Sequence, residues 1–216
     1  MQIRKAFSIL LTLLGIAAFA PQALAQMPLF ATLSPPQPVE GGGKVEVTEF
    51  FWYGCPHCYA LEPYINAWLK NKPQDVVFKR VPTYNEGWAP MVVLYYTLEA
   101  MGLADEYHQK VFDAIHKQNV NLNNHNKRDE WLKTNGIDPA KYAEFEKSFT
   151  VATKVQRSKQ LTQAYKVDGV PRLFVNGKYF TSPEQAGGAD RTFLVVDQLI
   201  ANARKENVAA APKAKS

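Results

Sequence analysis

The spacing of apolar and polar positions predicts a strand, a helix and a second strand around the only two cysteines of the chain. Residues 45–51 are mostly β-branched or aromatic and alternate little, as is typical of a strand buried on both faces. Residues 59–71 carry a helical pattern, and Cys55 and Pro56 before them suit the cap and the first turn of that helix. A second strand is expected over residues 76–81, closed by Pro82.

Between residues 89 and 166 the pattern is helical. Leu103, Tyr107, Val111 and Ile115 recur every fourth residue, which places them on one face of a helix. The expected helices cover residues 89–101, 103–115 and 128–134, a further segment starting at Asp138-Pro139, and residues 151–165.

The pattern returns to strands near the end of the chain. Residues 172–175 and 178–181 flank Asn176-Gly177, a pair that strongly favours a type I′ hairpin turn. Residues 182–189 are expected to form a loop, and Asp190 is expected to cap a last helix. The segment 206–216, rich in alanine and lysine, is expected to be disordered.

The first 25 residues have the pattern of an export signal. Arg4 and Lys5 precede an apolar run at residues 6–20, and Ala23-Leu24-Ala25 fits the small-x-small cleavage rule. We expect cleavage after Ala25, and the alternative is an uncleaved membrane anchor. The short apolar run favours cleavage. Residues 26–43, with several prolines and three glycines, are expected to be a linker.

Composition and charge add little to this picture. The chain has 216 residues and a formal net charge of +5. Loss of the signal would remove two of its 25 basic residues and none of its 20 acidic ones, which leaves a weak excess of three positive charges. Basic residues do not cluster with aromatic ones, so we expect no nucleic-acid partner.

The two cysteines form the tetrapeptide Cys55-Pro56-His57-Cys58. A disulfide across two intervening residues closes a very small loop and stabilises a fold little, so an exported protein gains more from such a pair as a redox centre. The alternative is a metal site. It would need two further ligands, and His108, His116 and His125 show no ligand spacing, so we expect no metal.

Two stretches resemble the DsbA family of periplasmic disulfide oxidases. They are residues 50–59, which contain the Cys-Pro-His-Cys tetrapeptide, and residues 169–177, which contain Val170-Pro171. The resemblance covers about residues 44–204. It implies an α/β thioredoxin-like fold, built from residues 44–87 and 167–205, with a helical domain at residues 88–166 inserted between the second strand and the cis-Pro hairpin.

The resemblance also implies roles for the residues of the site. Cys55 is the exposed, attacked sulfur, and Cys58 lies one turn deeper and closes the disulfide. A helix N-terminus and His57 stabilise the Cys55 thiolate, which lowers the pKa of its thiol. In the family, the proline that matches Pro171 is cis and lies against the cysteines. The main chain of Val170 is then available to pair with an extended substrate.

Glu49 and Lys79 are charged residues within apolar strand patterns. The family carries an acidic residue six positions before the first cysteine, which Glu49 matches, whereas Lys79 matches a basic position less securely. We expect the two to form a partly buried pair beneath Cys58 that accepts or relays its proton. The alternative is that both are charges at the edge of a strand.

The resemblance implies a soluble, monomeric periplasmic enzyme that introduces disulfides into newly exported proteins. A quinone-linked membrane partner of the DsbB type would recharge it, and it would need no bound cofactor because the Cys55–Cys58 pair carries the electrons. The alternatives are a disulfide isomerase or reductase on the same scaffold, and a non-catalytic periplasmic chaperone or metal carrier. A dimer would favour the isomerase, but the short stretch before Lys44 offers no dimerisation domain.

Overall fold

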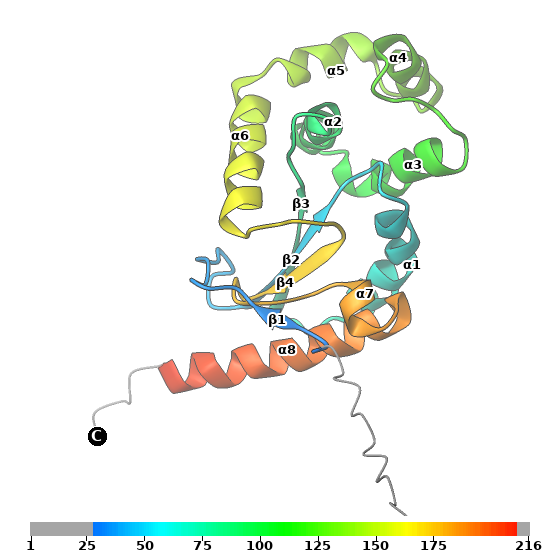
Figure 1. Cartoon of the computed structure of the whole chain (residues 1–216). Coiled ribbons are helices and arrows are strands. Elements are labelled where there is room, and N and C mark those ends of the chain that lie inside the picture. Colours follow the sequence, from blue (N-terminus) through cyan, green and yellow to red (C-terminus); the bar gives the residue numbers. More distant parts are fainter. Residues whose placement is uncertain (1–27, 211–216) are drawn as a thin grey trace, which may run out of the picture.

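The computed structural model of the protein describes residues 28–210, and a five-stranded sheet lies at its centre (Figure 1). The strands are β1 (Ala31–Thr32), β2 (Val45–Phe51), β3 (Val76–Pro82), β4 (Arg172–Val175) and β5 (Tyr179–Thr181). Their order across the sheet is β1-β5-β4-β2-β3. The order places β3 at one edge of the sheet. The β2–β3 pair is parallel and the other pairs are antiparallel.

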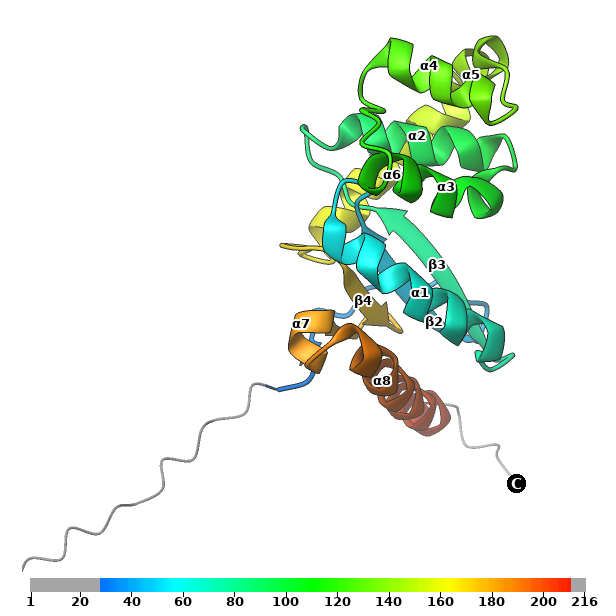
Figure 2. The same cartoon turned by 90° about the vertical axis from the view of Figure 1, so that its right-hand side faces the viewer.

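Eight helices surround this sheet within the described residues. They are α1 (Pro56–Asn71), α2 (Ala89–Ala100), α3 (Ala104–His116), α4 (His125–Thr134), α5 (Pro139–Glu146), α6 (Phe149–Ala164), α7 (Pro183–Ala186) and α8 (Ala189–Ala210). Helices α2 to α6 gather at one end of the sheet, whereas α8 lies away from this block, against the face of the sheet that α1 also covers (Figures 1 and 2). This helical block follows β3 and precedes β4, which confirms the predicted thioredoxin-like fold with its insertion. No helix in the described part of the chain is both long and apolar enough to cross a membrane.

The two faces of the sheet carry different cores because side chains alternate along each strand. Val45 and Val47 of β2 face α1 and α8 and pack with their apolar residues. Phe50 of β2 faces the other way, where it packs against Phe174 and against Tyr165 at the end of α6. The end of β2 enters a third core, which includes both cysteines and is shared with the helical block.

Three predicted segments differ from the structure. Residues 26–43 contain a short strand, β1, whose Ala31 pairs with Phe180 in β5. The predicted loop at 182–189 contains the one-turn helix α7, since Ser182 accepts a hydrogen bond from the main-chain N–H of Gln185. Neither element is long enough to show a period in the sequence.

The third difference is at the C-terminus. Helix α8 continues to Ala210, so residues 206–210 are helical rather than disordered. Lys178 and Tyr179 both hydrogen-bond to Glu206, which ties this part of the helix to the hairpin. The predicted export signal at 1–25 and the last part of the predicted tail, 211–216, lie outside the described residues.

The predicted hairpin turn is confirmed. Asn176 and Gly177 have φ values of 53° and 65°, as a type I′ turn requires. A Cβ atom at Gly177 would lie 2.1 Å from the carbonyl oxygen of Gln37, so the close approach of the N-terminal segment also requires glycine there.

Candidate active site

The cysteine motif occupies the turn between β2 and α1. Cys55 stands at the N-cap position with an extended backbone, and Pro56 begins the helix, where its missing N–H costs no hydrogen bond. Gly54 is required by the turn, because a Cβ atom there would lie 2.3 Å from the ring of Trp52. That ring is held in place by stacking on Trp88 at a centroid distance of 4.5 Å. The turn therefore presents Cys55 in a fixed position.

Both cysteines are free thiols in this structure. The prediction that Cys55 is exposed is wrong in degree, since only 7% of the residue is accessible, whereas Cys58 is fully buried. The cause is the segment around Val170, whose carbonyl oxygen accepts a hydrogen bond from the Cys55 thiol at 3.4 Å. The predicted order still holds, because Cys55 is the more accessible of the two sulfurs.

The two thiols have opposite acidities. The pKa of Cys55 is lowered to about 6, chiefly by a hydrogen bond from Cys58, and further by the main-chain N–H groups of Cys58 and His57 and the charge of His57, although burial opposes the shift. Burial raises the pKa of Cys58, and the neighbouring Cys55 and Glu49 raise it further. Near neutral pH the reduced site therefore holds a thiolate at Cys55 and a thiol at Cys58.

A cavity of about 500 Å³ lies beside Val170, whose carbonyl oxygen accepts the hydrogen bond from the Cys55 thiol. His57, the segment 169–172 and the segment 182–184 line it. The Val170–Pro171 peptide bond is cis, as the resemblance implied. Pro56 and His57 are exposed. This cavity offers room for a polypeptide segment next to Cys55.

Glu49 is fully buried and lies next to Arg80 rather than Lys79. The two are paired in the β2–β3 register, and Arg80 Nε is 3.3 Å from Glu49 Oε2. Burial, and then the negative charge of Glu62, raises the pKa of Glu49 to about 8, while Arg80 opposes this shift. Glu49 in turn raises the pKa of Cys58 through its charge, so a carboxyl group able to carry a proton near neutral pH is coupled to the buried thiol.

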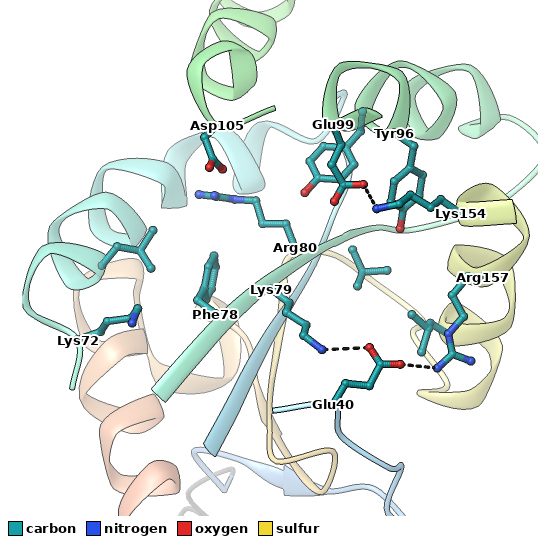
Figure 3. Close-up of a pocket in the computed structure, with 14 residues that line it drawn as sticks. Glu40, Lys72, Phe78, Lys79, Arg80, Tyr96, Glu99, Asp105, Lys154 and Arg157 are labelled. Atoms are coloured by element: carbon teal, nitrogen blue, oxygen red, sulfur yellow. Dashed lines mark hydrogen bonds and ion pairs between the residues drawn. The ribbon is translucent and has the colours of Figure 1, made fainter. Parts of the chain in front are cut away.

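The predicted pairing of Glu49 with Lys79 is wrong. Lys79 leaves β3 on the opposite face, where its ammonium group lies 2.7 Å from Glu46 and 3.3 Å from Glu40. Figure 3 shows Lys79 and Arg80 pointing in different directions from the same strand. The physical reason is the two-residue repeat of a strand, which sends adjacent side chains to opposite faces.

Three further residues, to which the sequence analysis assigned no part in proton transfer, complete the buried cluster. Glu62 contacts Arg80 at 3.2 Å and His108 at 3.1 Å, and His108 in turn contacts the Tyr53 hydroxyl at 2.9 Å. A signal for Glu62 existed, because it follows Cys58 by four residues and therefore shares its face of α1. Between residues 28 and 210, no group of three or more histidine, cysteine or acidic side chains is arranged to hold a metal ion.

Comparisons with known proteins agree with this geometry. Residues 46–200 match the model of the family described as DSBA-like thioredoxin domain. The thiol:disulfide interchange protein DsbA of Bordetella parapertussis is 45% identical over 205 residues, which cover 92% of this chain and 98% of that protein. The DsbA of Pseudomonas aeruginosa is 40% identical over 200 residues, or 92% of this chain and 93% of that protein.

Solved structures give the same result. The crystal structure of Pseudomonas aeruginosa DsbA superposes with a TM-score of 0.78 at 40% identity, covering 86% of this chain and 95% of that one. The match includes both the sheet and the helical block, because it extends over nearly all of the described residues. The chain belongs to the DsbA family of thioredoxin-fold thiol:disulfide oxidoreductases.

Proposed function

We propose that this protein donates its Cys55–Cys58 disulfide to newly exported proteins in the periplasm. The single observation that carries the proposal is the unequal acidity of the two thiols, with the pKa of Cys55 lowered to about 6 and that of Cys58 raised. A stabilised thiolate favours the reduced protein and so makes the disulfide a stronger oxidant. Each pKa unit below the ambient pH is worth about 1.4 kcal/mol, or about 30 mV for a two-electron couple.

The reaction proceeds in two exchanges. A client thiolate attacks Cys55 Sγ, the Cys55–Cys58 bond breaks, and the electron pair leaves on Cys58. A second client thiolate then attacks the client sulfur of the mixed disulfide and expels Cys55 as a thiolate. The client loses two electrons and gains a disulfide, and the protein ends with a thiolate at Cys55 and a thiol at Cys58.

In this proposal Glu49 supplies the proton that Cys58 needs. A thiolate in a fully buried position is costly, so Cys58 must gain a proton as its bond to Cys55 breaks. Glu49 can hold a proton near neutral pH, and its partner Arg80 takes the place that the sequence suggested for Lys79. On reoxidation the same carboxylate receives the proton back.

The remaining site residues bind and orient. His57 lines the cavity and stabilises the Cys55 thiolate. Pro56 fixes the first turn of α1, which directly follows Cys55. Val170 and Pro171 border the same cavity and provide the surface on which an extended client segment lies. Since the Cys55–Cys58 pair carries both electrons, no bound cofactor is needed.

The proposed setting follows from the export signal expected at 1–25 and from the family. Clients are unfolded or reduced exported proteins, the protein acts as a monomer, and a quinone-linked membrane protein of the DsbB type reoxidises it.

Two measurements test the proposal. The oxidised protein is mixed with a reduced, unfolded client, and we expect rapid loss of client thiols, none with Cys55→Ser, and a trapped mixed disulfide with Cys58→Ser. Equilibration against glutathione then gives the reduction potential of the Cys55–Cys58 pair. A strongly oxidising value supports an oxidase, whereas a value near that of thioredoxin would mean a reductase instead.

A further inference from the structure

A buried line of polar side chains connects the region of Cys58 to helix α3. It runs from Glu49 through Arg80, Glu62 and His108 to the hydroxyl of Tyr53, and every contact along it is between 2.9 and 3.3 Å. The line joins β2, β3, α1 and α3. Arg80, the least buried of the five, is only 13% accessible at its side chain.

The two carboxylates of this line are not equally supported. Glu62 accepts a hydrogen bond from Arg80 on one oxygen and from His108 on the other. Neither oxygen of Glu49 has a hydrogen-bond partner among the described residues, although Arg80 lies 3.3 Å away. Among residues 28–210, Arg80 is the one permanent cation that acts on these two buried carboxyl groups. Hydrogen bonding favours the charged form, so the negative charge belongs on Glu62 and the proton on Glu49.

His108 is suited to donate to Glu62. Burial lowers the pKa of its imidazole, so the ring is neutral and carries one N–H. An ionised Glu62 can only accept, so its contact with Nε2 at 3.1 Å places the ring proton on Nε2, and Nδ1 then accepts from the Tyr53 hydroxyl. The rings of Phe51 and Phe112 stand edge-on to His108, each at 5.1 Å, and hold it in this orientation.

We propose that His108 is a positioning residue for the thiol exchange: its hydrogen bond to Glu62 keeps the negative charge on Glu62 and so keeps the exchangeable proton on Glu49, beside Cys58. This inference rests on the proposed role of Glu49. It adds a group on α3, from the helical block, to a proton transfer that otherwise involves only the sheet and α1.

The other polar groups around the line do not replace this bond. Burial raises the pKa of the Tyr95 hydroxyl on α2, so it stays neutral and adds no charge next to Glu49 and Arg80. Asp105 acts on His108 from its own helix, through charge alone. Loss of the His108 donor would raise the pKa of Glu62, so Glu62 would carry less negative charge. Because the charge of Glu62 raises the pKa of Glu49, the pKa of Glu49 would then fall.

The test is a pH titration of the side-chain carboxyl groups by NMR, in reduced protein with isotope-labelled glutamate. The Glu49 signal is assigned from Glu49→Gln. The variants are His108→Leu, which removes the donor, and His108→Gln, whose amide restores an N–H near the position of Nε2. His116→Leu is the matched control, because His116 lies on the same helix and bonds the carbonyl oxygen of Tyr53 rather than Glu62.

We expect the Glu49 midpoint to fall by about one pH unit or more in His108→Leu, a tenfold change in proton affinity. The midpoint should return in His108→Gln and stay unchanged in His116→Leu. The pH profile of client oxidation should move in the same direction. A Glu49 midpoint that stays in place in a folded His108→Leu protein would overturn the inference.

Failure of the underlying role gives a different result. If Glu49 in the wild-type protein titrates in the ordinary carboxyl range, the proton transfer through Glu49 is wrong whatever His108 does. Should His108→Leu not fold, Glu62→Gln provides the second test, because it removes the competing charge with almost no change in shape. We expect the Glu49 midpoint to fall in Glu62→Gln, and an unchanged midpoint there would equally refute the inference.

Discussion

The two faces of β3 carry two ionic clusters that differ mainly in their access to water. On the inner face Arg80 contacts Glu49 and Glu62, whose side chains are 0% and 1% accessible. On the outer face Lys79 contacts Glu46, and it also contacts the exposed Glu40, as Figure 3 shows. Arg80 and Lys79 are neighbours in the sequence, so the environments differ only because a strand alternates its side chains.

The two cations lower the pKa of their carboxyl partners alike, yet the net shifts of the two carboxyl groups are opposite. Glu40, hydrogen-bonded to Lys79 at the surface, has its pKa lowered by that bond and by the charge of Lys79. Glu49, next to Arg80 in the interior, has its pKa raised to about 8 because desolvation outweighs the attraction. A nearby cation is thus not enough to ionise a buried carboxyl group. This is why the inner cluster can store a proton and the outer one cannot.

The largest effect is expected from removing the central cation of each cluster. Arg80→Met would leave buried carboxylates without their cation, and breaking a buried pair in this way costs about 3–5 kcal/mol. Lys79→Met is the matched variant on the outer face. We expect it to lower the free energy of unfolding by about 1 kcal/mol or less, because Lys79 is partly exposed and the buried Glu46 keeps its hydrogen bonds from Thr48 and from the main-chain N–H of Glu40.

Urea denaturation of the reduced proteins at neutral pH measures both changes. Similar costs for the two variants would contradict the distinction between the clusters. A loss in Arg80→Met that shrinks strongly at acidic pH would support it, because Glu62, which is charged at neutral pH, is then protonated as Glu49 already is.

The second effect is that the ionisation of Glu49 and that of Glu40 change the stability of the protein with pH in opposite directions. The folded-state pKa of Glu49 is raised from 4.5 to about 8, so wild-type stability falls as pH rises through this window, in which only the unfolded chain loses the proton. Glu49→Gln removes that loss, and its stability relative to wild type should increase from pH 5 to pH 8. The pKa of Glu40 is instead lowered from 4.5. Its ionised form therefore stabilises the folded protein above about pH 4.5, and this stabilisation is lost in acid.

Unfolding curves across this pH range check the signs. Glu40→Gln should be slightly less stable than wild type at neutral pH, and the difference should vanish in acid. A Glu49→Gln protein whose stability relative to wild type does not change with pH would show that Glu49 is already ionised in the folded state.

The sequence was sufficient for the fold and for the cysteine motif because those signals are local. The strand before Cys55, the helix after it and the Asn176-Gly177 turn each follow from residues next to one another. Strand β1 and helix α7 were missed because two-residue and four-residue elements show no period. Strand β1 also depends on a partner distant in the sequence, because its Ala31 pairs with Phe180, whereas α7 is held locally by the Ser182 cap.

The cation partner of Glu49 could not be predicted in the same way. Each face of β3 carries apolar residues and one cation, Lys79 on one and Arg80 on the other, so the local pattern does not decide which face is buried with Glu49. The β2–β3 register decides it, by setting Glu49 opposite Arg80. His108 is a similar case, because its importance depends on α3 packing against α1.

The smallest expected effect concerns the periphery of the outer cluster. Arg157 reaches Glu40 at 3.5 Å, and both side chains are more than half exposed. We expect Arg157→Gln to cost at most a few tenths of a kcal/mol in low salt and nothing measurable in high salt, because counterions screen exposed charges. The cost of Arg80→Met should persist in high salt, since its partners are out of reach of ions. Denaturation of both variants at two salt concentrations makes the comparison. Equal salt sensitivity would mean that water and ions reach the inner cluster, and a carboxyl group in such a place would not retain its proton at neutral pH.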